Sequence, residues 1–351
     1  MIKRRKSKEI SIGNVKIGNN NPISVQSMCN TDTRDIEQTS HQIKELANAG
    51  CELVRLAVLN KDAAEAIKTL VKISPVPLIA DIHFDYRLAI QCMNNGISAL
   101  RLNPGNIGKR ENVEKVVTLA KQQNIPIRIG VNAGSLEKDL KEKDIPLSEK
   151  MVESAMKHIQ ILEDLDFDKI KISLKSSDVL TTIEAYRLMA QKVDYPLHLG
   201  VTEAGTLKNG LIKSSVGLGT LLAEGIGDTI RVSLTENPIE EVYAGFEILK
   251  SLKLRQRGVN FVSCPTCGRT QINLIELAKK VEDRFKNLNE NITIATMGCA
   301  VNGPGEAANA DFGIAGGINE GYIFKKGEII AKVPEAELLD KLEEVITKSY
   351  K

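Results

Sequence analysis

Short runs of apolar, β-branched residues alternate with longer amphipathic segments along most of the chain. Eight runs of strand length follow one another at 23–28, 53–58, 76–82, 99–102, 125–131, 169–174, 197–201 and 229–234. Between them, apolar residues recur at helical spacing, as in segments 35–49 and 148–165. Eight βα units in about 240 residues have the size of a TIM (β/α)8 barrel. The pattern favours this barrel over a doubly wound open sheet.

A second, smaller α/β domain is predicted after the barrel. The last barrel helix is expected at 239–253, and the polar stretch 255–260 is typical of a connector. Beyond it, the pattern predicts an amphipathic helix at 270–286, strands at 292–295 and 312–315, a hairpin at 322–333 and a final helix opened by Pro334. We therefore divide the chain into a barrel domain, 1–256, and a C-terminal domain, 257–351.

The charge balance argues against nucleic acid or an anionic membrane as a partner. Lysine and arginine number 47, aspartate and glutamate number 45, and the formal net charge is +2. No apolar run has the length of a membrane span or of a signal-peptide core. We expect a soluble, cytoplasmic protein. Its six cysteines are few for 351 residues, and in a reducing compartment they would be free or metal-bound.

Polar side chains gather where the predicted strands end, which is where barrel enzymes place their chemistry. Four of these side chains belong to arginines, and a charged group inside a barrel is costly without a partner. The four arginines outnumber the carboxylates nearby, so we expect an anionic ligand at the mouth, most simply a phosphate or diphosphate. The arginines are Arg55, Arg101, Arg128 and Arg231. The other polar residues at these ends are Gln26, Ser27, Asn30, Asp81, His83, Asn103, Asn132, Lys175, Ser176, Ser177, His198, Thr202, Glu203 and Ser233.

Two glycine-containing segments are further candidates for phosphate contact. Segment 214–220 is expected to form a glycine-rich turn before a short helix at 221–224, where backbone N–H groups could hold a phosphate. Segment 103–108, after the fourth strand, also brings backbone to the mouth, although a plain turn explains it almost as well.

Three cysteines stand in two groups near the C-terminus, Cys264 with Cys267 in a C-x-x-C pair and Cys299 before a glycine-rich stretch. This spacing fits an iron–sulfur cluster, a structural zinc site or a redox dithiol. All four histidines lie far upstream, so a local Cys2His2 finger is excluded. Three thiolates are one short of a four-ligand site, and the open position is where a substrate could react. The remaining cysteines are expected to be small buried hydrophobes: Cys29, Cys51 and Cys92.

Seven motifs, in order along the chain, match a known family. They are VQSM at 25–28, VPLIADIHFDY at 76–86, RLNPGNIG at 101–108, IRIGVNAGS at 127–135, LHLGVTEAG at 197–205, CPTC at 264–267 and VNGPGE at 301–306. Together they resemble the 4-hydroxy-3-methylbut-2-enyl diphosphate synthases, iron–sulfur reductases that act late in the methylerythritol phosphate route to isoprenoids. The resemblance extends from about residue 10 to about residue 335. It is to the short bacterial form, because the large central insertion of the plant-type enzymes is missing.

The resemblance implies a substrate and a cofactor. The substrate would be 2-C-methyl-D-erythritol 2,4-cyclodiphosphate, whose ring is opened reductively with loss of water. The cofactor would be a 4Fe-4S cluster whose ligands correspond here to Cys264, Cys267, Cys299 and Glu306. A carboxylate exchanges more readily than a thiolate, so Glu306 could leave the unique iron when a substrate oxygen arrives. Reduced flavodoxin or ferredoxin would supply the electrons one at a time.

The resemblance also implies roles for residues of the barrel. Glu203 is expected to handle a proton at the departing hydroxyl. Cys29 stands where relatives commonly carry threonine, so no hydroxyl is available at that position. The residues expected to bind the diphosphate and the substrate hydroxyls, or to lie near them, are Arg55, Asp81, His83, Arg101, Asn103, Arg128, Asn132, Lys175, Thr202, Arg231 and Ser233.

The family's arrangement is a head-to-tail homodimer in which the cluster domain of one subunit covers the barrel mouth of the other.

Two other functions fit parts of the pattern. In the first, the small domain is an electron carrier or metal module and the barrel an inert scaffold, which the surplus arginines argue against. In the second, the barrel is a transferase for a phosphorylated, pterin-like substrate and the small domain holds structural zinc. Brown, anaerobically purified protein would indicate a cluster, and colourless protein would indicate zinc.

Overall fold

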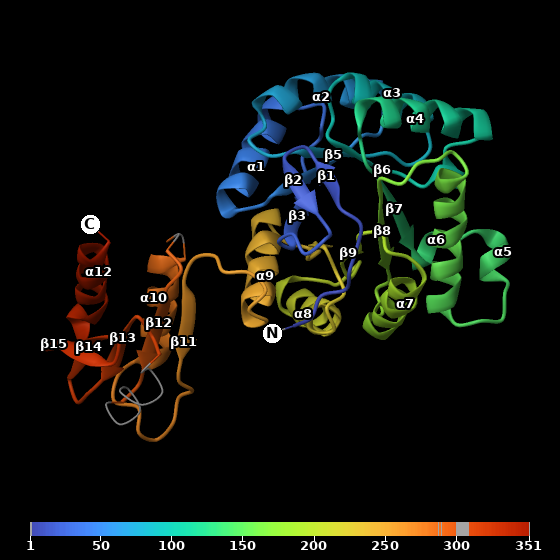
Figure 1. The fold of residues 1–351 in the computed structure, drawn as a ribbon. Coiled ribbons are helices and arrows are strands. Elements are labelled where there is room, and N and C mark those ends of the chain that lie inside the picture. Colours follow the sequence, from blue (N-terminus) through green and yellow to red (C-terminus); the bar gives the residue numbers. More distant parts are fainter. Residues whose placement is uncertain (1, 287, 289, 300–308, 351) are drawn as a thin grey trace. The chain divides into compact units, whose positions relative to one another are not determined.

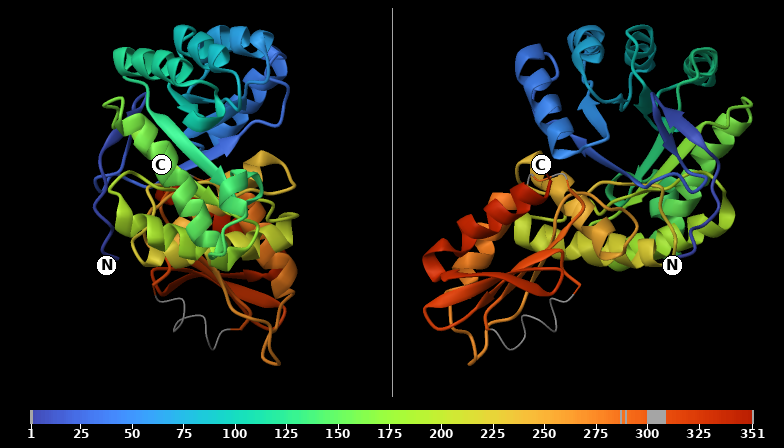
Figure 2. Two further views of the ribbon diagram at one scale, coloured as in Figure 1. Left: turned by 90° about the vertical axis from the view of Figure 1, so that its right-hand side faces the viewer. Right: turned by 60° about the vertical axis from the view of Figure 1, so that its left-hand side comes forward.

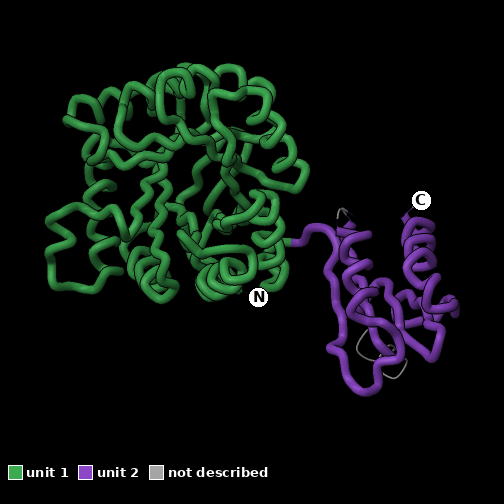
Figure 3. The backbone as a smooth tube through the Cα atoms, turned by 180° about the vertical axis from the view of Figure 1, so that it is seen from behind, with its two compact units in different colours: residues 1–255 green, residues 256–351 purple. Residues whose placement is uncertain are grey.

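The computed structural model of the chain describes residues 2–286, 288, 290–299 and 309–350. It contains two compact units, Met1–Arg255 and Gln256–Lys351, which are coloured separately in Figure 3. Among the helices of the described ranges, none combines the length and the apolar character that a membrane crossing requires.

The first unit is a barrel of parallel strands with helices on the outside (Figures 1 and 2). The strands pair in the order β8-β7-β6-β5-β4-β3-β10-β9, and a bridge between Ile172 and Leu197 joins the two ends of this row. The predicted TIM barrel is confirmed. Its strands are β3 (Ser24–Met28), β4 (Leu53–Ala57), β5 (Leu78–Asp81), β6 (Ala99–Arg101), β7 (Ile127–Asn132), β8 (Ile170–Lys175), β9 (His198–Leu199) and β10 (Thr229–Ile230).

The barrel helices begin and end at residues that favour those positions. Asp35 accepts a hydrogen bond from Gln38 N at the start of α1, and Gly50 ends the same helix with a φ of 102°. The helices are α1 (Ile36–Ala49), α2 (Lys61–Ile73), α3 (Tyr86–Asn94), α4 (Arg110–Gln123), α5 (Lys138–Lys141), α6 (Leu147–Glu163), α7 (Val179–Lys192), α8 (Leu207–Ala223) and α9 (Pro238–Ser251). Short 3-10 turns lie at Pro104–Asn106 and Ala133–Ser135.

The strands present different chemistry to their two sides. In β8, the apolar residues Ile170, Ile172 and Leu174 belong to the main core between strands and helices. Because side chains alternate along a strand, Lys171 and the other polar residues of β8 face the inside of the barrel. The inside of this barrel is therefore a polar compartment on the β8 side.

An N-terminal hairpin, which the sequence pattern did not reveal, packs against the other half of the barrel. It consists of β1 (Ile10–Ile12) and β2 (Val15–Ile17) in antiparallel pairing. Its buried isoleucines form a small apolar cluster with strand residues that lie near the amino ends of β4, β5 and β6: Leu53, Ile79 and Ala99. The hairpin therefore covers apolar inner positions that water would otherwise reach.

The predicted glycine-rich turn at 214–220 is wrong, because this segment lies inside α8. Glycine costs a helix only about 1 kcal/mol relative to alanine. At Gly217 the absence of a side chain allows close packing, since a Cβ there would lie 2.9 Å from Val201 Cγ2. Gly217 thus serves the contact between α8 and its neighbours, while a Cβ at Gly219 would meet nothing within 4 Å, and the segment forms no phosphate loop.

The second unit contains a five-stranded sheet and, within its described residues, the helices α10 and α12. Its strand order is β11-β12-β13-β14-β15, parallel between β11 and β13 and antiparallel from β13 to β15. The first strand, β11, was not predicted and follows the expected connector. The predicted helix at 270–286 begins later, at Leu274. The elements are β11 (Asn260–Ser263), α10 (Leu274–Phe285), β12 (Thr293–Met297), β13 (Phe312–Gly316), β14 (Glu320–Lys325), β15 (Glu328–Pro334), a 3-10 turn (Glu335–Glu337) and α12 (Leu338–Ser349).

Candidate functional site

Charged side chains from four neighbouring strands form a row on the inner face of the barrel. Residues that pair in register on adjacent parallel strands point to the same face of the sheet. Asp81 on β5 pairs with Arg101 on β6. Arg128 on β7 pairs with Arg101 on one side and with Lys171 of β8 on the other. The fold thus places three cations and one carboxylate, all buried, next to one another.

Asp81 is the carboxylate at the centre of the arginines. Its Oδ1 lies 3.2 Å from Arg101 Nη1, and its Oδ2 lies 3.6 Å from Arg55 Nε. Burial by itself would raise the pKa of Asp81, but the surrounding arginines, Arg55 foremost, bring it below its ordinary value. Asp81 is therefore ionised and compensates part of the positive charge.

Arg231 has a carboxylate partner that comes from a helix. Its Nε lies 3.1 Å from Glu241 Oε2, and its Nη2 lies 3.1 Å from Glu241 Oε1. Glu241, on α9, also accepts a hydrogen bond from Ser27 Oγ at 2.8 Å. The wall of the barrel itself thus neutralises one of the four arginines.

Arg128 is a buried arginine with unpaired polar atoms. Its residue surface is 3% exposed, and among the described residues its Nε and Nη1 have no hydrogen-bond partner. Burial lowers the pKa of Arg128 well below its ordinary value, and Arg55 and Arg101 lower it further. For Arg55, burial lowers the pKa to about 10 although Asp81 opposes the shift. Buried guanidinium groups of this kind need an anion.

Two buried lysines of β8 add to the positive charge. Burial, followed by repulsion from Arg128, lowers the pKa of Lys171 and that of Lys175 well below the ordinary value. Among the described residues, six cationic side chains on the inner strand positions face two carboxylates. The six cations are Arg55, Arg101, Arg128, Lys171, Lys175 and Arg231, and the two carboxylates are Asp81 and Glu241. The predicted surplus of positive charge is present and larger than the arginines alone suggested.

The mouth of the barrel carries amide, hydroxyl and imidazole groups. Asn103 is fixed by the backbone of Gly130, donating to its carbonyl oxygen at 3.0 Å and accepting from its N–H at 2.8 Å. A Cβ at Gly130 would lie 2.6 Å from Arg101 Nε, so glycine makes room for the guanidinium. His83 is exposed, with its Nε2 3.8 Å from Asp81 Oδ1. The remaining predicted residues, all half-buried, are Asn132, Thr202 and Ser233.

Glu203 lies on the solvent side of the mouth, directly after Thr202. It is exposed, and its φ of 52° falls in the left-handed region that favours glycine. Holding a non-glycine residue there costs on the order of 1 kcal/mol or more, and such strain is common at functional sites. Within the described part of the chain, no lysine, arginine or histidine forms an ion pair with Glu203. Its carboxylate is thus available for proton transfer.

Further polar residues line the inside of the barrel near the amino ends of β8, β9 and β10. We call Lys171, His198 and Thr229 the barrel floor. His198 Nδ1 lies 2.8 Å from Thr229 Oγ1, while His198 Nε2 and Lys171 Nζ have no partner among the described residues. Lys171 was not predicted, because the predicted site consists of residues at the carboxyl ends of strands and Lys171 lies near the amino end of β8. The alternation of apolar and polar residues in 170–175 was the signal that pointed to it.

The cysteines of the second unit follow two adjacent parallel strands. β11 and β12 pair in parallel, with Ser263 opposite Thr296. Cys264 and Cys267 come after β11, and Cys299 comes after β12. Since the carboxyl ends of neighbouring parallel strands meet at one edge of a sheet, the fold brings the two cysteine groups to the same edge.

The surroundings of these thiols suit the thiolate form that binds iron. Gly298 N donates a hydrogen bond to Cys264 Sγ at 3.2 Å. Hydrogen bonds from the backbone and side chain of Arg269 lower the pKa of Cys267. Glu306, the predicted fourth ligand, lies outside the described residues. Within the described ranges, no three Cys, His, Asp or Glu side chains stand at metal-binding distances. The sulfur donors and their positive surroundings fit an iron–sulfur cluster.

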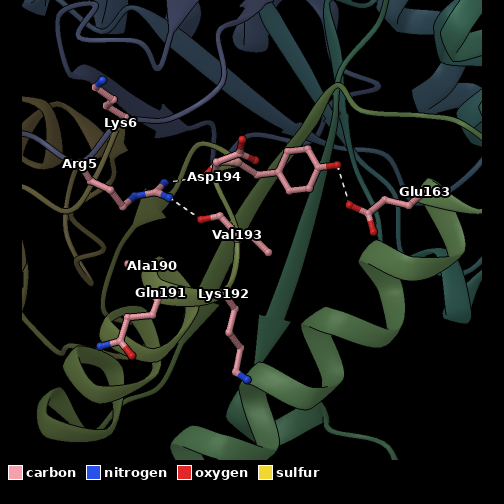
Figure 4. Close-up of a pocket in the computed structure, with 9 residues that line it drawn as sticks. Arg5, Lys6, Glu163, Ala190, Gln191, Lys192, Val193 and Asp194 are labelled. Atoms are coloured by element: carbon pink, nitrogen blue, oxygen red, sulfur yellow. Dashed lines mark hydrogen bonds between the residues drawn. The ribbon is translucent and has the colours of Figure 1, made fainter.

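A separate groove of about 410 Å³ lies at the amino end of the barrel strands, opposite the mouth (Figure 4). Arg5 donates to the backbone carbonyls of Val193 and Tyr195, both at 2.6 Å. Tyr195 Oη donates to Glu163 Oε1 at 2.8 Å. These bonds fasten the N-terminal segment to the loop between α7 and β9, so we assign the groove a structural role.

Comparison with known proteins gives one consistent result along the whole chain. Residues 7–246 match the GcpE TIM-barrel domain, and residues 260–348 match the GcpE protein C-terminal domain. The chain is 61% identical over 340 residues to the 4-hydroxy-3-methylbut-2-en-1-yl diphosphate synthase (flavodoxin) of Geobacter sulfurreducens, covering 97% of this chain and 96% of that protein. It is 58% identical over 346 residues to the enzyme of the same name from Clostridium perfringens, covering 98% and 99%.

Solved structures resemble the barrel at much lower identity. Dihydropteroate synthase from Stenotrophomonas maltophilia matches with a TM-score of 0.54 and 13% identity, over 70% of this chain and 97% of that chain. N-acetylneuraminic acid synthetase from Leptospira borgpetersenii matches with a TM-score of 0.51 and 14% identity, over 80% and 98%. At these identities the likeness shows the fold alone.

Proposed function

Because this chain belongs to the GcpE family of 4-hydroxy-3-methylbut-2-en-1-yl diphosphate synthases, we propose that its barrel binds the substrate diphosphate and that its C-terminal unit holds the redox centre. The enzyme is an oxidoreductase of the methylerythritol phosphate route to isoprenoids. It opens the ring of 2-C-methyl-D-erythritol 2,4-cyclodiphosphate with two electrons and loss of water, which yields 4-hydroxy-3-methylbut-2-en-1-yl diphosphate.

The surplus of buried cations is the observation that carries the proposal for the barrel. Six cationic side chains face two carboxylates inside the barrel. A cyclic diphosphate brings two negative charges, and guanidinium groups suit phosphate oxygens because they donate in a planar fork. Arg128 is the central ligand in this proposal, since its Nε and Nη1 have no partner among the described residues.

The remaining mouth residues would orient the substrate. Asp81 would keep Arg55 and Arg101 in place, since it contacts both. Amide, hydroxyl, imidazole, ammonium and guanidinium groups around the mouth would contact phosphate oxygens and the substrate hydroxyls. These groups belong to His83, Asn103, Asn132, Lys175, Thr202, Arg231 and Ser233.

Glu203 would relay a proton from solvent to the departing hydroxyl, which leaves as water. It follows β9 at the mouth, and its carboxylate makes no ion pair with the described residues. A group that transfers this proton must reach the leaving oxygen. The left-handed backbone conformation of Glu203 fixes the direction in which its exposed side chain leaves the backbone. Replacement of Glu203 by glutamine would keep the shape and remove the proton.

The C-terminal unit would hold a 4Fe-4S cluster through Cys264, Cys267 and Cys299, with Glu306 as the fourth ligand. Support comes from the parallel pairing of β11 with β12, which brings the cysteine groups to one edge of the sheet. The lowered pKa of Cys267 favours the thiolate that iron requires. When bound, such a cluster supplies electrons to the substrate one at a time.

Flavodoxin is named as the partner of the closely similar enzymes, and we propose flavodoxin or ferredoxin as the electron donor of this chain.

We also propose a head-to-tail homodimer. The outer face of α8 exposes large apolar side chains, which suits a protein interface. These are Leu207, Ile212 and Val216, exposed by 37%, 58% and 52%. All six cysteines are unpaired, which agrees with a cytoplasmic location.

An anaerobic assay tests the proposed function. Purified protein with the cyclodiphosphate and reduced flavodoxin should form the linear diphosphate, and the protein should be brown with about four iron and four sulfide per chain. Fully cluster-loaded protein that forms no product would contradict the proposal. Colourless protein with one zinc would instead indicate the transferase for a phosphorylated substrate. No described feature of the barrel supports that alternative over the family's reaction.

A further inference from the structure

Lys171 is a buried lysine for which the proposed function has not yet given a role. It lies in β8 with 1% of its surface exposed, and its Nζ has no hydrogen-bond partner among the described residues. Its position in register with Arg128 directs its side chain to the inside of the barrel. A buried amine without a partner is rare in proteins, so this one calls for a function.

The groups that face Lys171 are mostly cationic. They are Arg128 on β7, Arg55 on β4 and His198 on β9, and the carboxylate that acts on Lys171 within the described residues is Asp228, before β10. Asp228 is already engaged elsewhere, because its Oδ1 accepts from Ser7 Oγ at 2.8 Å and lies 3.2 Å from Arg4 Nη2. Its Oδ2 accepts from Leu197 N at 2.9 Å.

This environment disfavours a charged ammonium. Burial lowers the pKa of Lys171 well below its ordinary value, and Arg128 and Arg55 lower it further. Burial and the surrounding cations also lower the pKa of His198. An imidazole is either neutral or positive, so His198 cannot balance an ammonium. Burial without a hydrogen-bond partner and the neighbouring cations thus both act against an ammonium at Lys171.

The charge balance changes when a diphosphate enters. Besides Lys171, five cationic side chains on the described inner strand positions face two carboxylates, and a cyclic diphosphate adds two negative charges. The diphosphate thus offsets most of the positive charge that opposes an ammonium at Lys171. Arg128, the neighbour in register, is also the guanidinium with free donors.

We propose that Lys171 is part of the diphosphate site, uncharged in the free enzyme and protonated when the diphosphate binds beside Arg128. One proton moves from solvent to Lys171 Nζ for each site filled, and no other bond forms or breaks. The inference rests on the proposed function, since it takes the diphosphate as the ligand of the barrel. It adds a residue and a proton to that site.

Titration calorimetry of the holoenzyme with 2-C-methyl-D-erythritol 2,4-cyclodiphosphate, without reductant, tests this. Measured at one pH in buffers of different ionisation enthalpy, the binding heat gives the number of protons taken up. We expect net uptake by the wild type at pH 7 to 8, reduced by about one proton per site in Lys171→Met. Lys68→Met removes an exposed lysine from α2 and should bind with the wild-type proton number.

The outcomes separate the inference from its premise. Binding by the wild type without proton uptake, or with equal uptake in Lys171→Met, would overturn the role of Lys171. Absence of any binding to cluster-loaded wild type would instead overturn the proposed function. If Lys171→Met does not fold, Lys171→Arg takes its place: a guanidinium stays charged, so uptake should again fall by about one proton, and uptake equal to wild type would overturn the role of Lys171.

Discussion

Arg231 and Glu241 form a two-pronged ion pair through the wall of the barrel, with Nε to Oε2 and Nη2 to Oε1 distances of 3.1 Å each. Glu241 is 2% exposed, so loss of its charge would leave a buried guanidinium uncompensated. We expect Glu241→Gln to lower the free energy of unfolding by about 3 kcal/mol. Urea unfolding followed by circular dichroism measures this. Glu236→Gln, on the exposed loop before α9, should stay within about 0.5 kcal/mol of wild type, and an equal effect of both changes would refute the pair's role.

The sequence predicted the barrel because apolar runs alternate regularly with amphipathic helical segments along 23–253. It could not predict Glu241 as the partner of Arg231, because that contact joins α9 to the barrel interior and depends on the closed fold. The same limit explains the wrong prediction at 214–220, where Gly217 marks close helix packing. A glycine-rich segment has no local feature that distinguishes a phosphate loop from such a helix.

Three strands outside the repeating alternation of the barrel were not predicted. β1 and β2 precede the first βα unit, and β11 follows the last one, so no regular spacing of neighbouring elements indicates them. The candidate site was predicted by residue type at strand ends. Lys171 was missed because its place in the site depends on the strand register with Arg128, and that register is a property of the folded barrel.

The stability of the free protein should depend on pH through Lys171. Its pKa is lowered in the folded chain, so below the ordinary value of about 10.4 the unfolded chain binds a proton that the folded chain lacks. The free energy of unfolding is therefore highest at high pH and decreases as the pH falls, by up to about 1.4 kcal/mol per pH unit. Lys171→Met has no amine at this position and should not show this decrease.

Urea unfolding at several pH values between 6.5 and 9 measures the effect. Lys171→Met should gain stability relative to wild type most at the low end of this range, and the gain should shrink as the pH rises. Lys68→Met, at an exposed position, should differ from wild type by the same amount at every pH. A difference between Lys171→Met and wild type that does not change with pH would show that Lys171 keeps its proton in the folded chain.

The cysteines should divide into two classes by iron content. Cys299→Ala should abolish iron binding or leave a degraded cluster, and Cys264→Ala and Cys267→Ala should do the same, because each removes a thiolate ligand. Cys92→Ala should keep the wild-type iron and sulfide content, since Cys92 lies in the barrel core. Iron and sulfide analysis with the visible spectrum measures this. Full cluster content in Cys299→Ala would remove that residue from the ligand set.

A shared active site in the proposed homodimer predicts complementation. Glu203→Gln has a defective barrel and Cys299→Ala a defective redox centre. After subunit exchange, half of the dimers are mixed, and each mixed dimer has one sound site if barrel and redox centre act across subunits. Activity should then recover to about a quarter of wild type. A tagged pull-down confirms the exchange, and inactivity after confirmed exchange would mean that each chain supplies its own complete site.

The central claim is that unpaired cations of the barrel bind the diphosphate, and Arg128 tests it most directly. Its Nε and Nη1 have no partner among the described residues, so Arg128→Met should leave the fold and the cluster spectrum unchanged. Calorimetric titration of the cluster-loaded variant with the cyclodiphosphate should show binding weakened by roughly 2 to 5 kcal/mol. Arg110→Met, on the exposed face of α4, should bind as wild type does. Unchanged affinity in Arg128→Met would contradict the claim and place the diphosphate elsewhere.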